Sequence, residues 1–217
     1  MNEDLPLEDI RQSYESSTLN KEDLLSDPIT MANKWLGEAI GNPDVPEPNT
    51  FTLATVDKDG QPSSRTLLIK GIELEGFIFY TNYRSRKGQE LNLNPKAAIL
   101  FFWQGLERQI RIEGAITKLD TAKSKAYFQS RPRESQVGAW ASPQSEVIPD
   151  RSILDDRVEE IGGIYKDSTV LPKPPHWGGY VLKPHYLEFW QGRANRMHDR
   201  LTYTKHGEAW EINRLAP

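Results

Sequence analysis

The spacing of apolar residues changes several times along the chain, and each change predicts a different element. Asp27 is a candidate N-cap, Pro28 follows it, and apolar residues then recur at helical spacing up to about Ile40. This pattern predicts a helix, which the Gly-Asn-Pro sequence directly after it should end. From Thr50 to Val56 the residues follow a strand pattern, and a hairpin signal closes it at 57–60. The chain is therefore expected to pass from a helix into a β-sheet.

Similar signals predict the remaining elements. Strands are expected at 62–72, 76–82, 97–103, 108–118, 180–183, 186–191, 201–205 and 208–213. Helices are expected at 86–94, 120–130, 133–140 and 151–162. The strand at 62–72 contains the run TLLI, which is apolar on both faces as a central strand should be. Strands joined mostly by short turns up to residue 118 favour a closed or nearly closed antiparallel barrel, because closure removes exposed sheet edges.

The composition is typical of a globular protein without disulfides. The chain has 217 residues, of which 37% are hydrophobic, a net charge of −4 and no cysteine. Residues 1–26 are polar and predict an N-terminal tail or lid segment, whereas 27–217 show no composition shift that would divide them. The proline-rich stretch 171–179 predicts a linker. No apolar run approaches the ~18 residues of a membrane span, and the acidic start does not resemble a signal peptide, so a cytoplasmic protein is expected.

Several chemistries are excluded by missing motifs. The sequence has no GxGxxG after a strand, no Walker-type loop and no GxSxG elbow. Its four histidines lack paired spacing, so no metal site is expected. The candidate chemistry therefore rests on arginine, lysine and hydroxyl side chains.

Two segments concentrate such side chains. Residues 188–200 read EFWQGRANRMHDR, and this mixture of planar and cationic groups suits a flat, anionic ligand. Residues 82–87 read NYRSRK and open a helix with Ser85 as candidate N-cap, where free backbone N–H groups and side-chain charges suit a phosphate. For each arginine taken alone, a solvated surface position remains the alternative. Because the cationic groups are spread over many segments, two phosphorylated ligands are expected.

Six segments together resemble the pyridoxine/pyridoxamine 5'-phosphate oxidases. They are RTLLIK, FYTNYRSRKGQEL, LERQIRIEG, YFQSRPRESQVGAWAS, EFWQGRANRMHDR and WEINRLAP, and the resemblance runs from about Ile10 to Pro217. It implies a mainly β fold with α: an FMN-binding split β-barrel, antiparallel and Greek-key-like, with peripheral helices. It also implies a homodimer with FMN at the subunit interface. The family's usual RLHDR is RMHDR here, which is a nearly volume-conserving change.

The reaction that the resemblance implies is an FMN-dependent oxidation. Pyridoxine 5'-phosphate or pyridoxamine 5'-phosphate would become pyridoxal 5'-phosphate, with O2 as acceptor and H2O2 as product, in vitamin B6 biosynthesis and salvage. The resemblance assigns the catalytic roles to Arg196 and His198. Which of the two accepts a proton stays open at this point.

The resemblance also implies the residues that bind FMN. They are Arg65, Thr66, Leu67, Leu68, Ile69, Lys70, Tyr80, Thr81, Arg86, Lys87, Gln109, Gln144, Ser145, Trp190 and Arg200. Arg65 and Lys70 are five residues apart and would lie on opposite faces of an ideal strand. Either a bulge separates them or they contact different ligands, and the family pattern favours the second alternative.

The implied substrate-binding residues come from other segments. They are Lys70, Tyr127, Arg131, Ser135, Arg196, Met197 and His198, with Arg11 and Tyr14 as lid residues. Tyr127 and Arg131 are four residues apart and would share one helix face. Arg196 and His198 are two apart and would face the same side of an extended chain.

Three other functions remain open. Another FMN-dependent split-barrel oxidoreductase would share the FMN residues but not the substrate set. A non-enzymatic flavin- or pyridoxal-phosphate-binding protein would bind without turnover. A barrel that stacks single-stranded nucleic acid on aromatic side chains is disfavoured by the net charge of −4.

Overall fold

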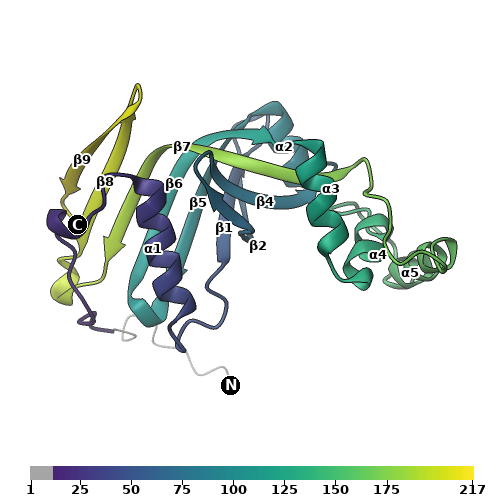
Figure 1. Ribbon diagram of the computed structural model, residues 1–217, viewed down its shortest axis with the longest axis horizontal. Helices are drawn as coiled ribbons and strands as arrows, with labels where there is room; N and C mark the ends of the chain where they lie inside the picture. Colours follow the sequence, from purple (N-terminus) through teal and green to yellow (C-terminus); the bar gives the residue numbers. More distant parts are fainter. Residues whose placement is uncertain (1–11) are drawn as a thin grey trace, which may run out of the picture. The chain divides into compact units, whose positions relative to one another are not determined.

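The computed structural model describes residues 12–217 (Figure 1). These residues divide into two compact units. Unit 1 runs up to Pro48 and includes Leu100–Ile112 and Tyr186–Pro217, and unit 2 consists of Asn49–Ile99 and Glu113–His185. The helices are α1 (Pro28–Ile40), α2 (Arg86–Leu93), α3 (Thr121–Ser130), α4 (Arg133–Ala141) and α5 (Ser152–Ile164). The strands are β1 (Thr50–Val56), β2 (Pro62–Leu68), β3 (Gly71–Glu73), β4 (Gly76–Asn82), β5 (Lys96–Trp103), β6 (Arg108–Lys118), β7 (Trp177–Gln191), β8 (Asp199–His206) and β9 (Ala209–Leu215). Short 3-10 turns lie at η2 (Lys21–Asp23), η3 (Gln104–Leu106) and η4 (Ala194–Arg196).

The strands hydrogen-bond in the order β2-β1-β5-β6-β7-β4-β3, with β8 paired to β7 and β9 paired to β8. The pairs β1–β2, β3–β4, β4–β7, β7–β8 and β8–β9 are all antiparallel. This confirms the predicted mainly antiparallel β fold with accompanying helices.

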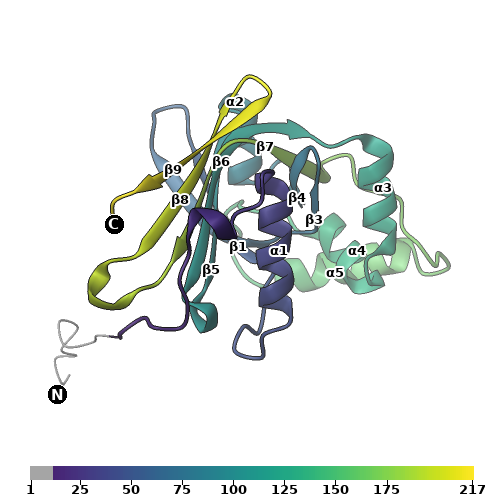
Figure 2. The ribbon, with the colours of Figure 1, turned by 60° about the vertical axis from the view of Figure 1, so that its left-hand side comes forward.

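Unit 1 is built on the predicted first helix. The Asp27 carboxylate accepts the Thr30 N–H at 2.8 Å, and Pro28 occupies the first turn, where its missing N–H leaves no hydrogen bond unmade. Trp35 of α1 is fully buried and meets the Phe189 ring edge-on, with centroids 5.0 Å apart. Strands β8 and β9 form a long antiparallel ribbon (Figure 2).

Unit 2 contains the β1–β2 hairpin, the β3–β4 hairpin and the helices α2 to α5. Ser85 caps α2 by accepting the Gly88 N–H, which confirms the predicted cap. The Asp120 carboxylate caps α3 by accepting the Ala122 and Lys123 N–H groups. Helices α4 and α5 lie side by side (Figure 1), and Phe128, Val137 and Trp177 form a small buried cluster with neighbouring aromatic residues. This cluster supports the walls of the cavity described below.

The predicted single strand at 62–72 is wrong, because the chain changes partner within it. Strand β2 ends at Leu68, and the Ile69 N–H still pairs alongside β1 by donating to the Asn49 carbonyl at 2.8 Å. The Lys70 N–H then donates to the Ile78 carbonyl of β4 at 2.9 Å. Strand β2 also lies at one end of the strand order and is not a central strand. The break, not a choice between two strand faces, separates Arg65 from Lys70.

The predicted linker at 171–179 is confirmed only as far as 176, and the two strands predicted after it form a single strand. Strand β7 is continuous from Trp177 to Gln191 and includes Pro184. Its pairing with β4 ends at Leu182 and its pairing with β8 begins at Tyr186, so the missing N–H of Pro184 costs no hydrogen bond to either strand. Among residues 12–217, none of the helices combines the length and the apolarity that a membrane crossing requires.

Candidate functional site

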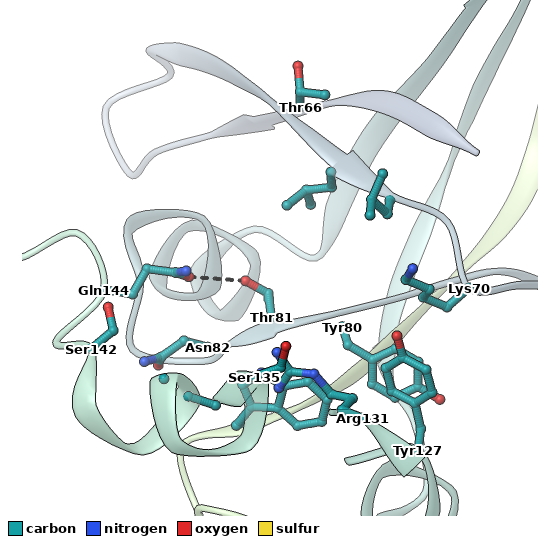
Figure 3. Close-up of a pocket in the computed structure, with 15 residues that line it drawn as sticks. Thr66, Lys70, Tyr80, Thr81, Asn82, Tyr127, Arg131, Ser135, Ser142 and Gln144 are labelled. Atoms are coloured by element: carbon teal, nitrogen blue, oxygen red, sulfur yellow. Dashed lines mark hydrogen bonds between the residues drawn. The ribbon is translucent and has the colours of Figure 1, made fainter. Parts of the chain in front are cut away.

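Unit 2 contains a cavity of about 500 Å³ between β2, β4 and the helices α3 and α4 (Figure 3). Ten of the residues assigned to FMN or substrate line it: Thr66, Leu67, Leu68, Lys70, Tyr80, Thr81, Tyr127, Arg131, Ser135 and Gln144. The chain break after Leu68 brings Lys70 to this cavity together with the residues of β4. The fold thus gathers side chains from positions 66 to 144 around one space.

One wall of the cavity is a stack of aromatic rings. The rings of Tyr80 and Tyr127 lie 3.9 Å apart between centroids at an interplanar angle of 22° (Figure 3). The Trp177 ring stacks on Tyr80 at 5.4 Å and 10°. Burial, followed by the nearby Tyr127, raises the pKa of Tyr80 to about 12, so its hydroxyl stays protonated at neutral pH. The wall is therefore aromatic and uncharged.

Arg131 is one of two cationic residues, with Lys70, that line this cavity. Its Nη1 is buried and has no hydrogen-bond partner in the described part of the chain, and its guanidinium lies 4.9 Å from the Trp177 ring centroid. Burial lowers the pKa of Arg131 below its usual value, although an arginine remains charged at neutral pH. A buried donor without a partner is costly, so a site that keeps one is suited to an anionic ligand.

The predicted reason for pairing Tyr127 with Arg131 is wrong, although both residues line the cavity. Helix α3 ends at Ser130, and Arg131 is its C-cap with an extended backbone (φ −73°, ψ 151°). The proline at position 132 disfavours helical geometry for the residue before it, which explains the early end. The two side chains converge through this turn rather than along one helix face.

The N-terminus of α2 lies beside the same cavity. Lys87 is buried, and its Nζ donates to the Gln144 Oε1 at 3.3 Å; the Thr81 hydroxyl donates to the same oxygen at 3.3 Å (Figure 3). Burial and then the charge of Arg65 lower the pKa of Lys87, while Glu90 acts in the opposite direction. Gln144 thus connects a buried ammonium to the cavity lining. Ser145, which follows, is exposed and has a left-handed backbone (φ 73°).

Arg65, Arg86 and Ile69 do not line the cavity. The Arg65 guanidinium donates to Ser63, Thr55, the Leu53 carbonyl and Glu90, and the Arg86 Nε donates to Glu90 at 2.8 Å. Ile69 is a core residue with 4% of its surface exposed.

Unit 1 contains a second cavity of about 590 Å³, lined by Gln12, Ser13, Tyr14, Arg193, Asn195, Arg196 and His198. The predicted extended geometry around Arg196 is wrong, because Asn195 (φ 56°) and Arg196 (φ 60°) both have left-handed backbones. A tight turn, not strand alternation, brings Arg196 and His198 to one cavity.

His198 is held in a defined orientation. Its Nδ1 accepts the Arg193 N–H at 3.1 Å, and its ring lies 4.6 Å from the Trp190 ring and 5.9 Å from the Tyr14 ring, between centroids. Burial and then the charge of Arg196 lower the pKa of His198. A neutral imidazole whose Nδ1 accepts carries its proton on Nε2, so His198 offers this cavity a hydrogen-bond donor.

The other residues predicted in this unit have separate surroundings. Arg200 forms a bidentate pair with the buried Glu188 carboxylate, with N···O distances of 2.8 and 3.1 Å. Gln109 is half-buried on β6, and Met197 is 67% exposed. Tyr14 lies edge-on to Trp190 at 5.8 Å between centroids. Arg11 lies outside the described residues.

Sequence reasoning missed several lining residues. Asn82, Gly138, Ala139, Ser142 and Trp177 line the first cavity, and Gln12, Ser13, Arg193 and Asn195 line the second without having been assigned to a ligand. Asn82 belongs to the motif FYTNYRSRKGQEL, and Gly138 to Ser142 are the GAWAS part of another, so the motifs contained this signal. Trp177 was not assigned to the site because residues 171–179 were predicted to be a linker.

The antiparallel strand pairing, the flanking helices and the cation-bearing cavity define a split β-barrel protein. The structure of PhzG from Burkholderia lata in complex with tetrahydrophenazine-1-carboxylic acid is similar, with a TM-score of 0.85 and 34% identity over 92% of this chain and 98% of that one. An FMN binding protein from Nostoc punctiforme, related to pyridoxamine 5'-phosphate oxidase, shares the fold with a TM-score of 0.69 at 18% identity, covering 88% of this chain and 98% of that one. The predicted fold class is confirmed.

Sequence comparisons give the family. Residues 42–165 match the family described as pyridoxamine 5'-phosphate oxidase, and residues 177–217 match the pyridoxine 5'-phosphate oxidase C-terminal dimerisation region. The pyridoxine/pyridoxamine 5'-phosphate oxidase of Acaryochloris marina is 50% identical over 97% of this chain and 95% of its own length, and that of Bordetella petrii 51% identical over 98% and 100%. The chain belongs to the pyridoxine/pyridoxamine 5'-phosphate oxidase family, which confirms the resemblance drawn from its motifs.

Proposed function

We propose that the protein is an FMN-dependent oxidase that converts pyridoxine 5'-phosphate or pyridoxamine 5'-phosphate to pyridoxal 5'-phosphate. O2 is the acceptor and H2O2 the product, and the enzyme serves pyridoxal phosphate biosynthesis and salvage in the cytoplasm. The observation that carries the proposal is the buried, unpartnered Arg131 Nη1 in a cavity shared with Lys70, Tyr127 and Ser135. Two cations and two hydroxyls around one space form the donor set that a phosphate monoester requires.

The residues at the other edge of the cavity fit FMN. The N-terminus of α2 presents backbone N–H groups beside the buried Lys87 ammonium, and this combination suits a phosphate. Gln144 and Thr81 add amide and hydroxyl groups at the cavity lining. FMN, when bound, supplies the group that accepts electrons from the substrate.

The substrate phosphate is held by Lys70, Tyr127, Arg131 and Ser135 in this proposal. The uncharged aromatic wall excludes water from one side of the site, so the charge–charge contacts of the phosphate are stronger than in bulk solvent. A phosphate fixed at one end leaves the pyridine ring little freedom to rotate, which favours reaction by orientation. The protein thus contributes binding and positioning.

Arg196 and His198 orient the substrate ring. The Nδ1 of His198 accepts a hydrogen bond from the Arg193 N–H, so the imidazole carries its proton on Nε2. This Nε2–H donates a hydrogen bond to an oxygen on the substrate ring. His198 is therefore a donor rather than a proton acceptor at Nε2. Trp190 packs against the imidazole and keeps it in place.

The working form is a homodimer in which a second copy of the chain completes each site. The match of residues 177–217 to a dimerisation region supports this part of the proposal. Trp190, Arg196, His198 and Arg200 all belong to that region.

A second candidate is another FMN-dependent split-barrel oxidoreductase. The similarity to PhzG, whose complex contains a carboxylic acid, favours it, because a carboxylate could also pair with Arg131. The two candidates differ in whether the preferred substrate carries a phosphate.

The test is an absorption spectrum of the purified protein with FMN, followed by pyridoxine 5'-phosphate without oxygen. The proposal would be supported if the bands of oxidised flavin bleach on adding substrate, return when air is admitted, and H2O2 forms as they return. Bands that bleach with tetrahydrophenazine-1-carboxylic acid but not with pyridoxine 5'-phosphate would favour the second candidate. FMN binding without bleaching by either compound would mean a carrier, and failure to bind FMN would refute the proposal.

A further inference from the structure

Glu90, on α2, is a buried carboxylate with an unusual number of donors. It has 4% of its surface exposed and accepts hydrogen bonds from Thr55, Ser63, Arg65 and Arg86. The Ser63 hydroxyl lies 2.9 Å and the Arg65 Nη2 3.3 Å from its Oε2, while the Arg86 Nε lies 2.8 Å from its Oε1. These donors belong to β1, β2 and α2, so one side chain ties three elements together.

The carboxylate is ionised despite its burial. Burial acts to raise the pKa of Glu90, but hydrogen bonds from Thr55, Arg86 and Ser63 and the charge of Arg65 outweigh it, and the pKa lies below its usual value. The position therefore carries a full negative charge at neutral pH.

Glu90 holds the two guanidiniums differently. Arg65 donates through both terminal nitrogens to protein acceptors. Arg86 donates to Glu90 only through Nε, and its terminal nitrogens have no partner among the residues that the structure describes. The i,i+4 contact on α2 thus fixes the direction of the Arg86 side chain and leaves its forked end available.

The charges of this cluster match a phosphate. Arg65, Arg86 and Lys87 carry three positive charges, and Glu90 cancels one of them, which leaves a net charge of +2. A phosphate monoester carries roughly −1.5 to −2 at neutral pH. Glu90 also opposes the lowering of the Lys87 pKa and so helps to keep this buried ammonium protonated.

We propose that Glu90 is a positioning residue for a phosphate site at the N-terminus of α2, where it orients Arg86 and Arg65 beside Lys87. The inference rests on the proposed function in one respect, since it takes the phosphate of FMN as the ligand. A side chain held in its binding conformation loses less freedom when the ligand arrives, so the carboxylate strengthens phosphate binding without touching the ligand.

The variant that tests this is Glu90→Asp, which keeps the charge but shortens the side chain by one methylene. The measurement is the dissociation constant of FMN and of riboflavin, obtained from flavin fluorescence on titrating the full-length protein. Riboflavin lacks only the phosphate, so the ratio of the two constants isolates the phosphate contribution. We expect the preference for FMN to fall about tenfold in Glu90→Asp, while riboflavin binding changes little.

The matched control is Gln89→Asn, which makes the same shortening at the neighbouring, exposed position, where the amide donates only to the Arg84 carbonyl. This variant is expected to keep the full preference for FMN. In an Arg86→Gln background, Glu90→Asp should lower the preference by less than it does alone, because part of its effect passes through Arg86.

Two results would overturn the inference. One is an equal loss of FMN and riboflavin binding in Glu90→Asp, which would mean a general structural role. The other is an unchanged preference for FMN in that variant. An unmodified protein without any preference for FMN over riboflavin would instead refute the proposed function.

Discussion

Replacing Arg131 with methionine should separate ligand binding from stability. In the ligand-free protein the buried, unpartnered Nη1 costs about 1–3 kcal/mol, and the contact of the guanidinium with Trp177 returns about 0.5–2 kcal/mol. The two contributions nearly cancel, and methionine keeps much of the apolar stem. We therefore expect the free energy of unfolding to change by no more than ~1 kcal/mol.

Ligand affinity should respond in a different way. A hydrogen bond to a charged group contributes about 1.5–3 kcal/mol, which corresponds to roughly 10- to 150-fold in the dissociation constant of pyridoxine 5'-phosphate. Calorimetric titration gives this constant, and urea unfolding gives the stability. Unphosphorylated pyridoxine should bind to the variant as it does to the unmodified protein.

Arg133→Met is the matched control, because Arg133 donates to the backbone carbonyls of Tyr165 and Ser168 instead of lining the cavity. It should be destabilised by about 1–3 kcal/mol, with unchanged affinity for the phosphorylated ligand. The reasoning would be refuted if Arg131→Met lost as much stability as Arg133→Met while its affinity stayed the same.

Three further substitutions test the geometry of unit 1. Glu188→Gln should lower the free energy of unfolding at pH 7 by about 1.5–3 kcal/mol, because the buried carboxylate accepts charged hydrogen bonds. The pKa of Glu188 is lowered in the folded state, since these contacts outweigh burial. The stability that Glu188 contributes is therefore present above the ordinary glutamate pKa and is lost as the pH falls through the pKa of the folded state. Urea unfolding of Glu188→Gln and of the unmodified protein should therefore give similar free energies in acid. Arg196→Met should raise the pKa of His198 by removing a nearby positive charge, and an NMR titration that finds it unchanged would contradict this. Gly192→Ala would place a Cβ 2.8 Å from the Cβ of Tyr14, so the substitution should lower the free energy of unfolding by about 1–3 kcal/mol and make the N-terminal segment more sensitive to protease. A variant as stable and as protease-resistant as the unmodified protein would rule out this contact.

Much of the candidate site could be found from motifs, because residues that share a ligand keep their own local sequence. Tyr127, Arg131 and Ser135 were assigned to one ligand on this basis, and they line one cavity. The local geometry used to connect Tyr127 with Arg131 was wrong, however. An ideal helix or strand describes a segment only as long as its neighbours allow the regular conformation, and the proline after Arg131 ends the helix early.

The sequence by itself determined the elements whose signals are local. The N-caps at Asp27 and Ser85 and the helices after them follow from hydrogen bonds within a few residues, which no distant contact needs to support. Strand periodicity likewise located β1, whose alternate residues are buried, because one apolar face is enough to specify register.

Tertiary structure alone decided where a strand changes its pairing strand and which polar groups stay without a hydrogen-bond partner. The chain leaves β1 after Ile69, because the Lys70 N–H pairs with the Ile78 carbonyl of β4 instead, and this change of partner delivers Lys70 to the cavity. Tertiary packing likewise leaves the Nη1 of Arg131 without a partner among the described residues. It also places the Glu90 carboxylate between β1, β2 and α2. Burial and hydrogen-bond satisfaction are properties of atoms brought together from distant positions, so no pattern within one segment contains them.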